Sequence, residues 1–357
     1  MVLTLDVCAD VALSGCVSAA LASLLYSLGL LPFTVVFLTS WAIAAAVCIL
    51  MASLYVSSAG KAVLITGCDS GFGFALAQHL DTLGFRVMAG CLALDGEGAN
   101  QLRASASPRL HTIQLDVTST DEVGRAVQEV EDLILEGEVL WAVVNNAGLS
   151  TFGEVEWVQE HTFRKILDVN VMGMVAVTKA FLPFIRQAKG RVVNMASMYG
   201  RMGNVMRGPY VLSKYAVEGF TDCLRQEMRP WGVAVSLIEP GNYVAATNIL
   251  TNDNVRAHGE AMWAAMSQRL RHDYTQHYFA TTIERMLGYT NGGYRNIGPV
   301  LEAITAAITH ASPRTRYMPM DAVSYFKVFV NTHLPEYIYD HYCTTIPRSH
   351  PVAAASS

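Results

Sequence analysis

A long stretch without any charged residue is the feature that most constrains how this chain can fold. Between Asp10 and Lys61 the sequence contains no Asp, Glu, Lys, Arg or His, and Pro32 divides the stretch near its middle. The stretch exceeds the roughly 20 apolar residues needed to cross a bilayer, and a soluble core helix seldom needs both faces apolar over such a length. We therefore predict two membrane helices, residues 11–31 and 33–56, with a single long crossing as the alternative.

The composition and the first residues agree with a retained membrane anchor over residues 1–60. Charged residues make up only 15% of the chain, against roughly 25% in soluble domains, and the mean hydropathy is +0.29. The first ten residues contain Asp6 and Asp10 but no base, whereas a secretory signal or a mitochondrial transit peptide needs basic residues there. Lys61, directly after the stretch, favours a cytosolic catalytic domain.

Two other classes of function find no support in the sequence. The seven cysteines are scattered without CxxC spacing or a histidine cluster, so neither a metal site nor a disulfide framework is expected. The net charge of −5 comes without a basic block. Nucleic acid is therefore not an expected partner.

From Lys61 onward, short apolar stretches alternate with amphipathic ones. The predicted strands are residues 61–66, 85–89, 110–115, 141–145, 191–195 and 233–238, and the predicted helices are residues 73–83, 120–135, 163–185 and 210–228. Strands separated by helices of this length run parallel with right-handed crossovers. The expected fold class is therefore α/β, a doubly wound parallel sheet of the Rossmann type, behind an N-terminal transmembrane anchor.

We assign residues 61–345 to one catalytic domain, because no second core or repeat is found, and residues 346–357 to a tail. Residues 247–298 have an amphipathic helical pattern and are expected to form a substrate lid, since connections beyond the strand ends border the ligand crevice. Residues 321–342 are rich in Tyr and Phe. Ordinary packing and contact with a membrane are both open interpretations of that aromatic cluster.

A glycine-rich loop after the first strand predicts a dinucleotide site. Glycines there permit a tight turn and let a pyrophosphate approach backbone N–H groups at a helix N-terminus. Two further strand ends are expected to border the adenosine and the nicotinamide. The cofactor-binding candidates are Gly67, Asp69, Ser70, Gly71, Phe72 and Gly73 in the loop, Asp116 for adenine, and Asn145, Ala147 and Gly148, with Tyr210 and Lys214 on the nicotinamide side.

The sequence favours NAD over NADP. The 2′-phosphate of NADP needs a basic partner, yet the glycine loop has no Lys or Arg and contains Asp69. The acidic residue that usually binds the ribose hydroxyls is missing from the end of the second strand. Asp95 is the only nearby candidate in the sequence.

The predicted chemistry rests on four residues. Tyr210 and Lys214 are four residues apart at the start of a predicted helix, so that the phenol and the ammonium share a face. The ammonium and a positively charged nicotinamide would stabilise the phenolate, which then exchanges a proton with the substrate oxygen. Ser197 follows the fifth strand and can hold that oxygen, and Asn170 could link Lys214 to solvent through a kinked helix or a water.

Together these elements resemble the short-chain dehydrogenase/reductase family over residues 61–342. The matching motifs are residues 66–73 (TGCDSGFG), residues 145–148 (NNAG), Asn170, Ser197, and Tyr210 with Lys214. The resemblance implies the catalytic roles given above and a homo-oligomer. Residues 67–73, 191–194 and 315–317 resemble the branch that contains retinol dehydrogenases, 17β-hydroxysteroid dehydrogenase type 2 and D-β-hydroxybutyrate dehydrogenase.

The substrate remains a choice between two classes. Residues 150–156 and 239–247 are most similar to the hydroxybutyrate enzyme, whereas the charge-free anchor is more similar to the steroid and retinoid members. We expect a lipophilic secondary alcohol, delivered from the lipid bilayer, in the endoplasmic reticulum membrane; a mitochondrial membrane is the alternative. A short hydroxy acid would need a cation for its carboxylate, for which Arg201 and Arg207 are candidates. A catalytically silent dinucleotide-binding scaffold is disfavoured by the intact catalytic motifs.

Overall fold

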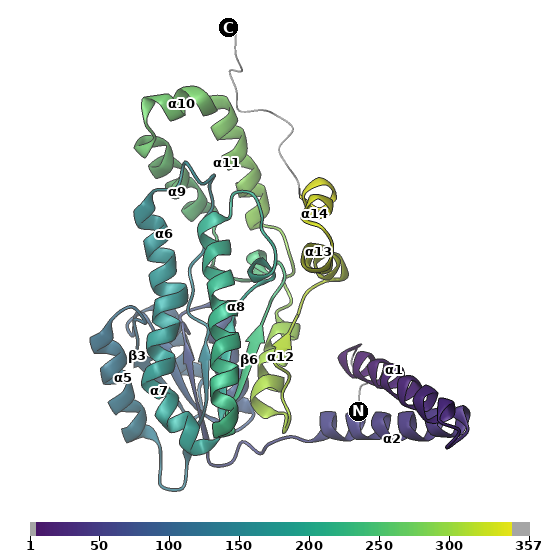
Figure 1. Ribbon diagram of the computed structural model, residues 1–357. Helices are drawn as coiled ribbons and strands as arrows, with labels where there is room; N and C mark the ends of the chain where they lie inside the picture. The colour runs from purple at the N-terminus through teal and green to yellow at the C-terminus, as the bar shows by residue number, and fades with distance from the viewer. Residues whose placement is uncertain (1–4, 345–357) are drawn as a thin grey trace. The chain divides into compact units, whose positions relative to one another are not determined.

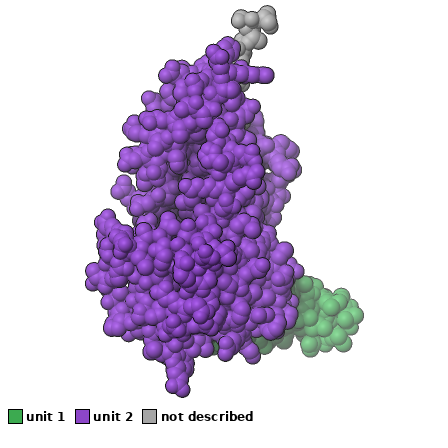
Figure 2. Space-filling view, turned by 90° about the vertical axis from the view of Figure 1, so that its left-hand side faces the viewer, with its two compact units in different colours: residues 1–57, 309–313 green, residues 58–308, 314–357 purple. Residues whose placement is uncertain are grey.

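The computed structural model describes residues 5–344, and these residues separate into two compact units (Figure 2). The described residues up to Ser57 form the first unit together with Thr309–Pro313. The remaining described residues, Ser58–Ile308 and those from Arg314 onward, form the second unit.

The first unit is a hairpin of two apolar helices, α1 (Leu5–Ser27) and α2 (Phe33–Ser53) (Figure 1). Trp41 of α2 donates a hydrogen bond from Nε1 to the carbonyl of Val11 on α1 at 2.9 Å. Cys8–Ser27 and α2 are each long and apolar enough to cross a membrane. The charge-free stretch therefore folds as two helices rather than as one.

The second unit contains a parallel sheet, which has seven strands in the described part of the chain, in the order β3-β2-β1-β4-β5-β6-β7. The direction in which strands are added reverses between β1 and β4, and in open α/β sheets the ligand crevice lies at that point. The strands are β1 (Lys61–Thr66), β2 (Arg86–Cys91), β3 (Leu110–Gln114), β4 (Val139–Asn145), β5 (Arg191–Met195), β6 (Ala234–Ile238) and β7 (Arg316–Tyr317).

Helices α5 (Thr120–Leu133), α7 (Met174–Ala188) and α8 (Gly208–Met228) lie together over the sheet (Figure 1). Their apolar faces join the strands in the main buried core, in which Phe181 and Ile185 have no exposed surface. Burial of such side chains supplies about 1.5–3 kcal/mol each. Further helices of this unit outside the lid include α3 (Gly71–Thr82), α4 (Glu97–Ser105), α12 (Gly298–Thr309), α13 (Ala322–His333) and α14 (Glu336–Tyr342).

The helix predicted over residues 163–185 is interrupted. It consists of α6 (Glu160–Leu167), a π-helical turn (Asp168–Gly173) and α7. A Cβ atom on Gly173 would lie 2.5 Å from Val117 Cγ2, so this turn packs closely against the loop after β3. The π-helical turn is where Asn170 is placed, and such turns often occur at functional sites.

The region expected to be a lid contains three helices, α9 (Asn252–Ala265), α10 (Gln268–Tyr274) and α11 (Gln276–Thr290). They share a buried cluster with Phe152 and Trp157, both without exposed surface, from the connection between β4 and α6. The sequence did not predict α4, α12, α13, α14 or β7. The shortest of these, β7 and α14, contain too few residues to establish a period.

Candidate active site

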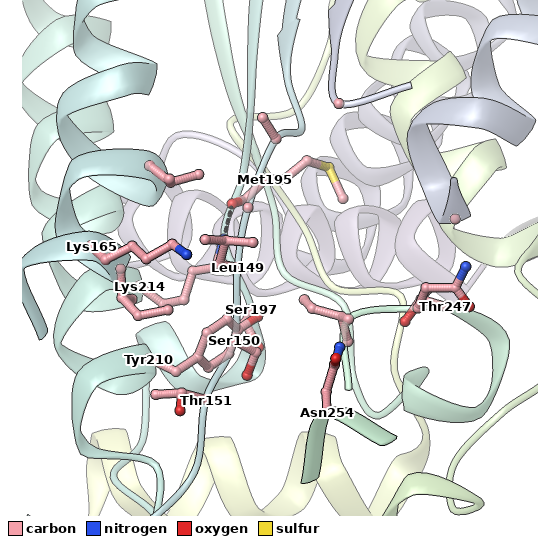
Figure 3. Close-up of a pocket in the computed structure, with 18 of the residues that line it drawn as sticks. Leu149, Ser150, Thr151, Lys165, Met195, Ser197, Tyr210, Lys214, Thr247 and Asn254 are labelled. Carbon is pink, nitrogen blue, oxygen red and sulfur yellow. Dashed lines mark hydrogen bonds between the residues drawn. The ribbon is translucent and has the colours of Figure 1, made fainter. Parts of the chain in front are cut away.

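A cleft of about 1080 Å³ opens at the carboxyl edge of the sheet, where the loops after β1, β4, β5 and β6 meet. Helix α6, the start of α8 and the lid helix α9 complete its walls. In the close-up, Ser197 and Tyr210 lie next to each other, and Asn254 of α9 lies across the cleft from them (Figure 3). The cleft therefore joins the predicted dinucleotide loop to the predicted catalytic residues.

The glycine loop is packed too tightly for side chains. A Cβ atom on Gly73 would lie 2.3 Å from the carbonyl oxygen of Gly67, and one on Gly67 would lie 2.8 Å from the Cα atom of Ala147. Gly71, with φ of +62°, begins α3 in a conformation that favours glycine. Ser70, Gly71 and Phe72 line the cleft and Gly73 lies beneath them. This cradle at a helix N-terminus fits the pyrophosphate of a dinucleotide.

The glycine loop also supplies a carboxylate to the end of β2. Asp69 accepts hydrogen bonds from the backbone N–H groups of Leu92 at 2.9 Å and Ala93 at 3.2 Å, and it lines the cleft. Asp95, which the sequence suggested for the ribose hydroxyls, does not line the cleft. The acidic group at this strand end thus comes from another loop, which the order of residues along β2 could not reveal.

The ends of β3 and β4 form the adjoining wall of the cleft. Asp116 lines the cleft, and its Oδ1 atom accepts hydrogen bonds from the backbone N–H of Thr118 at 2.9 Å and from the Thr118 hydroxyl at 2.7 Å. Ala147 and Gly148 line the cleft as well. These small residues leave the space that a bound ribose and nicotinamide would need.

Asn145 does not lie in the cleft, although the sequence made it a cofactor-binding candidate. It is buried, and its Nδ2 donates to Thr178 at 2.9 Å and to Asn194 at 2.8 Å. Its neighbour Asn146 lines the cleft and donates from Nδ2 to the carbonyl of Thr66 at 2.9 Å. Asn145 therefore joins strands within the sheet, because side chains alternate between faces along a strand.

Tyr210 and Lys214 both line the cleft from the first turns of α8. The Lys214 ammonium donates a hydrogen bond to the carbonyl of Met195 at 2.8 Å, drawn as a dashed line in Figure 3. Burial lowers the pKa of Lys214 to about 8, and the negative charge of Glu218 opposes this shift. The ammonium is thus held at the end of β5 beside the phenol.

The pKa of the Tyr210 phenol is subject to opposing influences. Burial raises it to about 12, against the stabilisation by Lys214 and a bound nicotinamide that the sequence predicted. The Ser197 hydroxyl and the positive charge of Arg207 lower it only in part. Burial prevails because the free energy needed to remove an ionised phenol from water exceeds the stabilisation that these neighbours provide.

Ser197 and Asn170 have different positions. Ser197 is buried, lines the cleft and accepts the backbone N–H of Tyr199 at 3.2 Å. Asn170 does not line the cleft: its Oδ1 accepts the N–H of Leu149 at 2.7 Å, and its Nδ2 donates to the Leu149 carbonyl and the Ser213 hydroxyl, both at 2.9 Å. Asn170 therefore ties the loop after β4 to α8 and does not reach Lys214 with its side chain.

The two candidate arginines are separated by the fold. Arg207 lines the cleft, is 4% exposed, and donates from Nη1 to the carbonyl of Thr151 at 3.4 Å. Within residues 5–344 no carboxylate forms an ion pair with it. Arg201 lies outside the cleft lining and pairs with the buried Glu239 at 3.8 Å. Of the two, only Arg207 can meet a substrate.

Several other polar residues line the substrate side of the cleft and carry no sequence motif. These residues are Tyr199, Asn254, His258 and Tyr289. Tyr199 lies two residues after Ser197, whereas the other three come from the lid, where helical periodicity cannot distinguish a cleft-facing position from a packed one.

Comparisons with known proteins agree with this geometry. The family described as short chain dehydrogenase matches residues 61–256. The mitochondrial D-beta-hydroxybutyrate dehydrogenase of Rattus norvegicus is 47% identical over 287 residues, covering 80% of this chain and 84% of the relative. Retinol dehydrogenase 16 of Mus musculus is 41% identical over 258 residues, covering 72% and 80%.

A solved structure has the same fold. The short chain dehydrogenase/reductase of Burkholderia phymatum, in complex with NAD, aligns with a TM-score of 0.62 and 22% identity. The alignment covers 82% of this chain and 99% of the bacterial chain. The charge-free helices therefore precede a conserved architecture rather than alter it.

Proposed function

The chain belongs to the short-chain dehydrogenase family and is an NAD(P)-dependent alcohol dehydrogenase, and from this premise we propose that it oxidises a short 3-hydroxy carboxylate with NAD. The sequence alone ranked a lipophilic alcohol first. The geometry of the cleft supports the reverse order. The relatives named D-beta-hydroxybutyrate dehydrogenase agree with the reversed order.

The observation that carries this proposal is the buried, unpaired cation of Arg207 beside the catalytic phenol. Its charge acts on the phenol of Tyr210, so the guanidinium and the reacting oxygen of a substrate share one region of the cleft. A buried cation without a counter-ion is costly. A substrate carboxylate would supply the counter-ion. Through bidentate hydrogen bonds it would also fix the position of the hydroxyl on the third carbon of the substrate.

The residues of the cleft have distinct roles in the proposed reaction. Ser197 holds the substrate oxygen, and Tyr210 accepts its proton. The glycine loop would hold a dinucleotide, which would supply a hydride acceptor and a positive charge that favours the phenolate. Lys214, hydrogen-bonded to Met195, keeps its ammonium beside the phenol and stabilises the same ionised form.

We infer that the cofactor is NAD. The carboxylate of Asp69 lies at the end of β2, where the adenosine ribose binds in this fold. A negative charge there accepts hydrogen bonds from ribose hydroxyls and repels a 2′-phosphate. None of the loop residues 67–73 is basic.

We also infer that α1 and α2 anchor the enzyme in a membrane, with the catalytic unit facing the cytosol. Their length and hydropathy support crossing, and Lys61 supports the cytosolic side. The compartment is proposed to be the endoplasmic reticulum, with a mitochondrial membrane as the alternative. Exposed apolar residues on the π-helical turn and α8, namely Met172, Leu212 and Tyr215, support a homo-oligomer.

A lipophilic alcohol is the second candidate, because part of the cleft is apolar. Ala261, Met262 and Ala265 of α9 line it, as does Ile249. A bilayer anchor would hold the enzyme at a membrane in which such a substrate dissolves. The relatives named retinol dehydrogenase are consistent with this class.

The test is a comparison of substrates with the full-length enzyme in detergent and NAD. D-3-hydroxybutyrate should be turned over with a far higher kcat/KM than 2-butanol, which has the same carbon number without the carboxylate. Arg207→Met should remove most of that difference. Turnover of retinol or estradiol, with no activity toward D-3-hydroxybutyrate, would reject the hydroxy acid in favour of the second candidate.

A further inference from the structure

The cation of Arg207 is stacked on an aromatic ring from the lid. The guanidinium carbon lies 4.6 Å from the centroid of the Tyr289 ring. Tyr289 is the second-last residue of α11, and it lines the cleft. Because a guanidinium over an aromatic face loses freedom to turn away, this contact restricts the direction in which Arg207 presents its N–H groups.

The opposite side of Arg207 is fixed by the backbone. The preceding residue, Met206, has φ of +65°, a conformation that non-glycine residues rarely adopt. Its carbonyl accepts the N–H of Gly153 at 2.9 Å, and Gly153 and Arg207 form a bridge between their backbones. Strain of this kind persists only where surrounding contacts hold it. The main chain thus brings Arg207 to the cleft, and the Tyr289 ring and the carbonyl of Thr151 together restrict its guanidinium.

Tyr289 also faces the aromatic wall around the catalytic phenol. Burial is the main cause that raises the pKa of Tyr199, and the neighbouring Tyr289 hydroxyl raises it further. The Tyr199 ring stands edge-on to the Tyr210 ring, with centroids 6.3 Å apart and planes at 85°. Asn204 donates a hydrogen bond of 2.8 Å to the Tyr199 hydroxyl. One lid residue therefore contacts Arg207, which is proposed to bind the substrate carboxylate, and neighbours Tyr199 in the wall of the catalytic site.

We propose that Tyr289 is a positioning residue that orients Arg207 toward the substrate carboxylate, so that recognition of the carboxylate depends on the packing of α11. This inference rests on the proposed hydroxy-acid activity. It assigns the selectivity for a carboxylate to a pair, Arg207 from the loop before α8 and Tyr289 from the lid. Neither residue would be sufficient alone.

The test compares Tyr289→Leu and Tyr289→Phe in the full-length enzyme with D-3-hydroxybutyrate and with 2-butanol. Leu removes the aromatic face, so KM for the hydroxy acid should rise about tenfold, the upper part of the range for a desolvated cation–π contact, with kcat within about twofold. Phe retains the face and should keep KM within about threefold of the wild type. For 2-butanol, kcat/KM should fall far less than for the hydroxy acid in the Leu variant, since that substrate has no carboxylate.

Tyr274→Leu is a matched control for general loosening of the lid. Tyr274 is the last residue of α10, does not line the cleft and donates a hydrogen bond of 2.7 Å to Glu156. The Tyr274→Leu variant should leave the ratio of kcat/KM for D-3-hydroxybutyrate to that for 2-butanol unchanged. NAD affinity, measured by fluorescence titration, should be retained in all three variants and verifies folding.

Three outcomes separate the two proposals. If Arg207→Met raises KM for the hydroxy acid but Tyr289→Leu does not, the positioning role is wrong and the hydroxy-acid activity stands. The positioning role is also overturned if Tyr289→Leu and Tyr289→Phe raise KM for the hydroxy acid equally. It is overturned as well if Tyr289→Leu lowers kcat/KM equally for both substrates. If the wild type does not turn over D-3-hydroxybutyrate, the proposed function fails and the inference fails with it.

Discussion

The Nζ atom of Lys214 lies 5.6 Å from the centroid of the Tyr210 ring and is hydrogen-bonded to the end of β5. The two residues are one helical turn apart in α8; Lys214 is buried, and Tyr210, which lines the cleft, is half-buried. Burial acts on them in opposite directions, raising the pKa of the phenol and lowering that of the ammonium. Both shifts disfavour the charged forms on which catalysis depends. A bound nicotinamide would bring a positive charge that favours the phenolate, and the phenolate in turn would favour the ammonium.

Tyr210→Phe should reduce kcat by about 10³-fold or more, because it removes the only group proposed to accept the substrate proton. NAD affinity should stay within about threefold, which fluorescence titration measures. Tyr215→Phe is the matched control, since Tyr215 lies on the same helix, is 44% exposed and does not line the cleft. A Tyr210→Phe enzyme with substantial turnover would disprove the assigned proton acceptor.

Ser197→Ala should lower kcat by about 10²-fold through the loss of a hydrogen bond to the reacting oxygen. It should also move the rising limb of the pH profile to higher pH. The sign follows from the site: the Ser197 hydroxyl lowers the pKa of Tyr210, so its removal raises that pKa further. The measurement is kcat/KM for oxidation against pH, and a shift to lower pH would contradict the assignment.

Lys214→Met should change how stability depends on pH. The folded protein lowers the pKa of Lys214 to about 8 from 10.5, so below pH 8 both folded and unfolded chains carry the ammonium and its burial cost is fully present. Above pH 8 the folded chain releases this proton while the unfolded chain keeps it, and stability rises with pH. From pH 7 to pH 9.5 the wild type should gain about 2 kcal/mol relative to the variant.

Urea denaturation of both proteins in detergent, without added NAD, measures this difference. The comparison is made between two pH values, so the packing change caused by methionine cancels. The free energy of unfolding of the wild type minus that of the variant should rise between the two pH values. If this difference stays constant or falls, the ammonium is not buried as described.

Asp69→Asn should relax the choice of cofactor. Asn keeps one acceptor oxygen for the backbone N–H groups at the end of β2 but removes the negative charge that would repel a 2′-phosphate. The ratio of kcat/KM for NAD to that for NADP should fall about tenfold, mainly through better use of NADP. If NADP remains as poor a cofactor as with the wild type, the selectivity arises elsewhere.

Ile43→Arg combined with Val47→Arg should weaken membrane insertion. These residues lie one turn apart on α2 and are 66% and 53% exposed. Each arginine costs about 2.5–3.5 kcal/mol at the centre of a membrane helix. The wild type should stay in the membrane pellet after alkaline carbonate extraction, whereas the double variant should be partly released. Equal retention would argue that α2 does not cross.

The two N-terminal helices, the parallel sheet and the motifs at the strand ends could be predicted from short segments of the sequence. The charge-free stretch predicted two helices, and the alternation of apolar and amphipathic segments predicted the parallel sheet. Motifs at the ends of strands could be assigned because those ends meet at one edge of such a sheet, as the glycine loop after β1 and Ser197 after β5 do. Each of these features repeats, or is defined, within a few residues of the chain.

Only the tertiary structure decided which distant residues share the cleft. Arg201 and Arg207 are equivalent in sequence, yet the backbone at Met206 directs one to the cleft while Glu239 holds the other outside it. The carboxylate at the end of β2 comes from the loop after β1, and Tyr289 comes from the lid. Such contacts depend on loop conformation and on packing between segments far apart in sequence, and neither has a periodic signature along the chain.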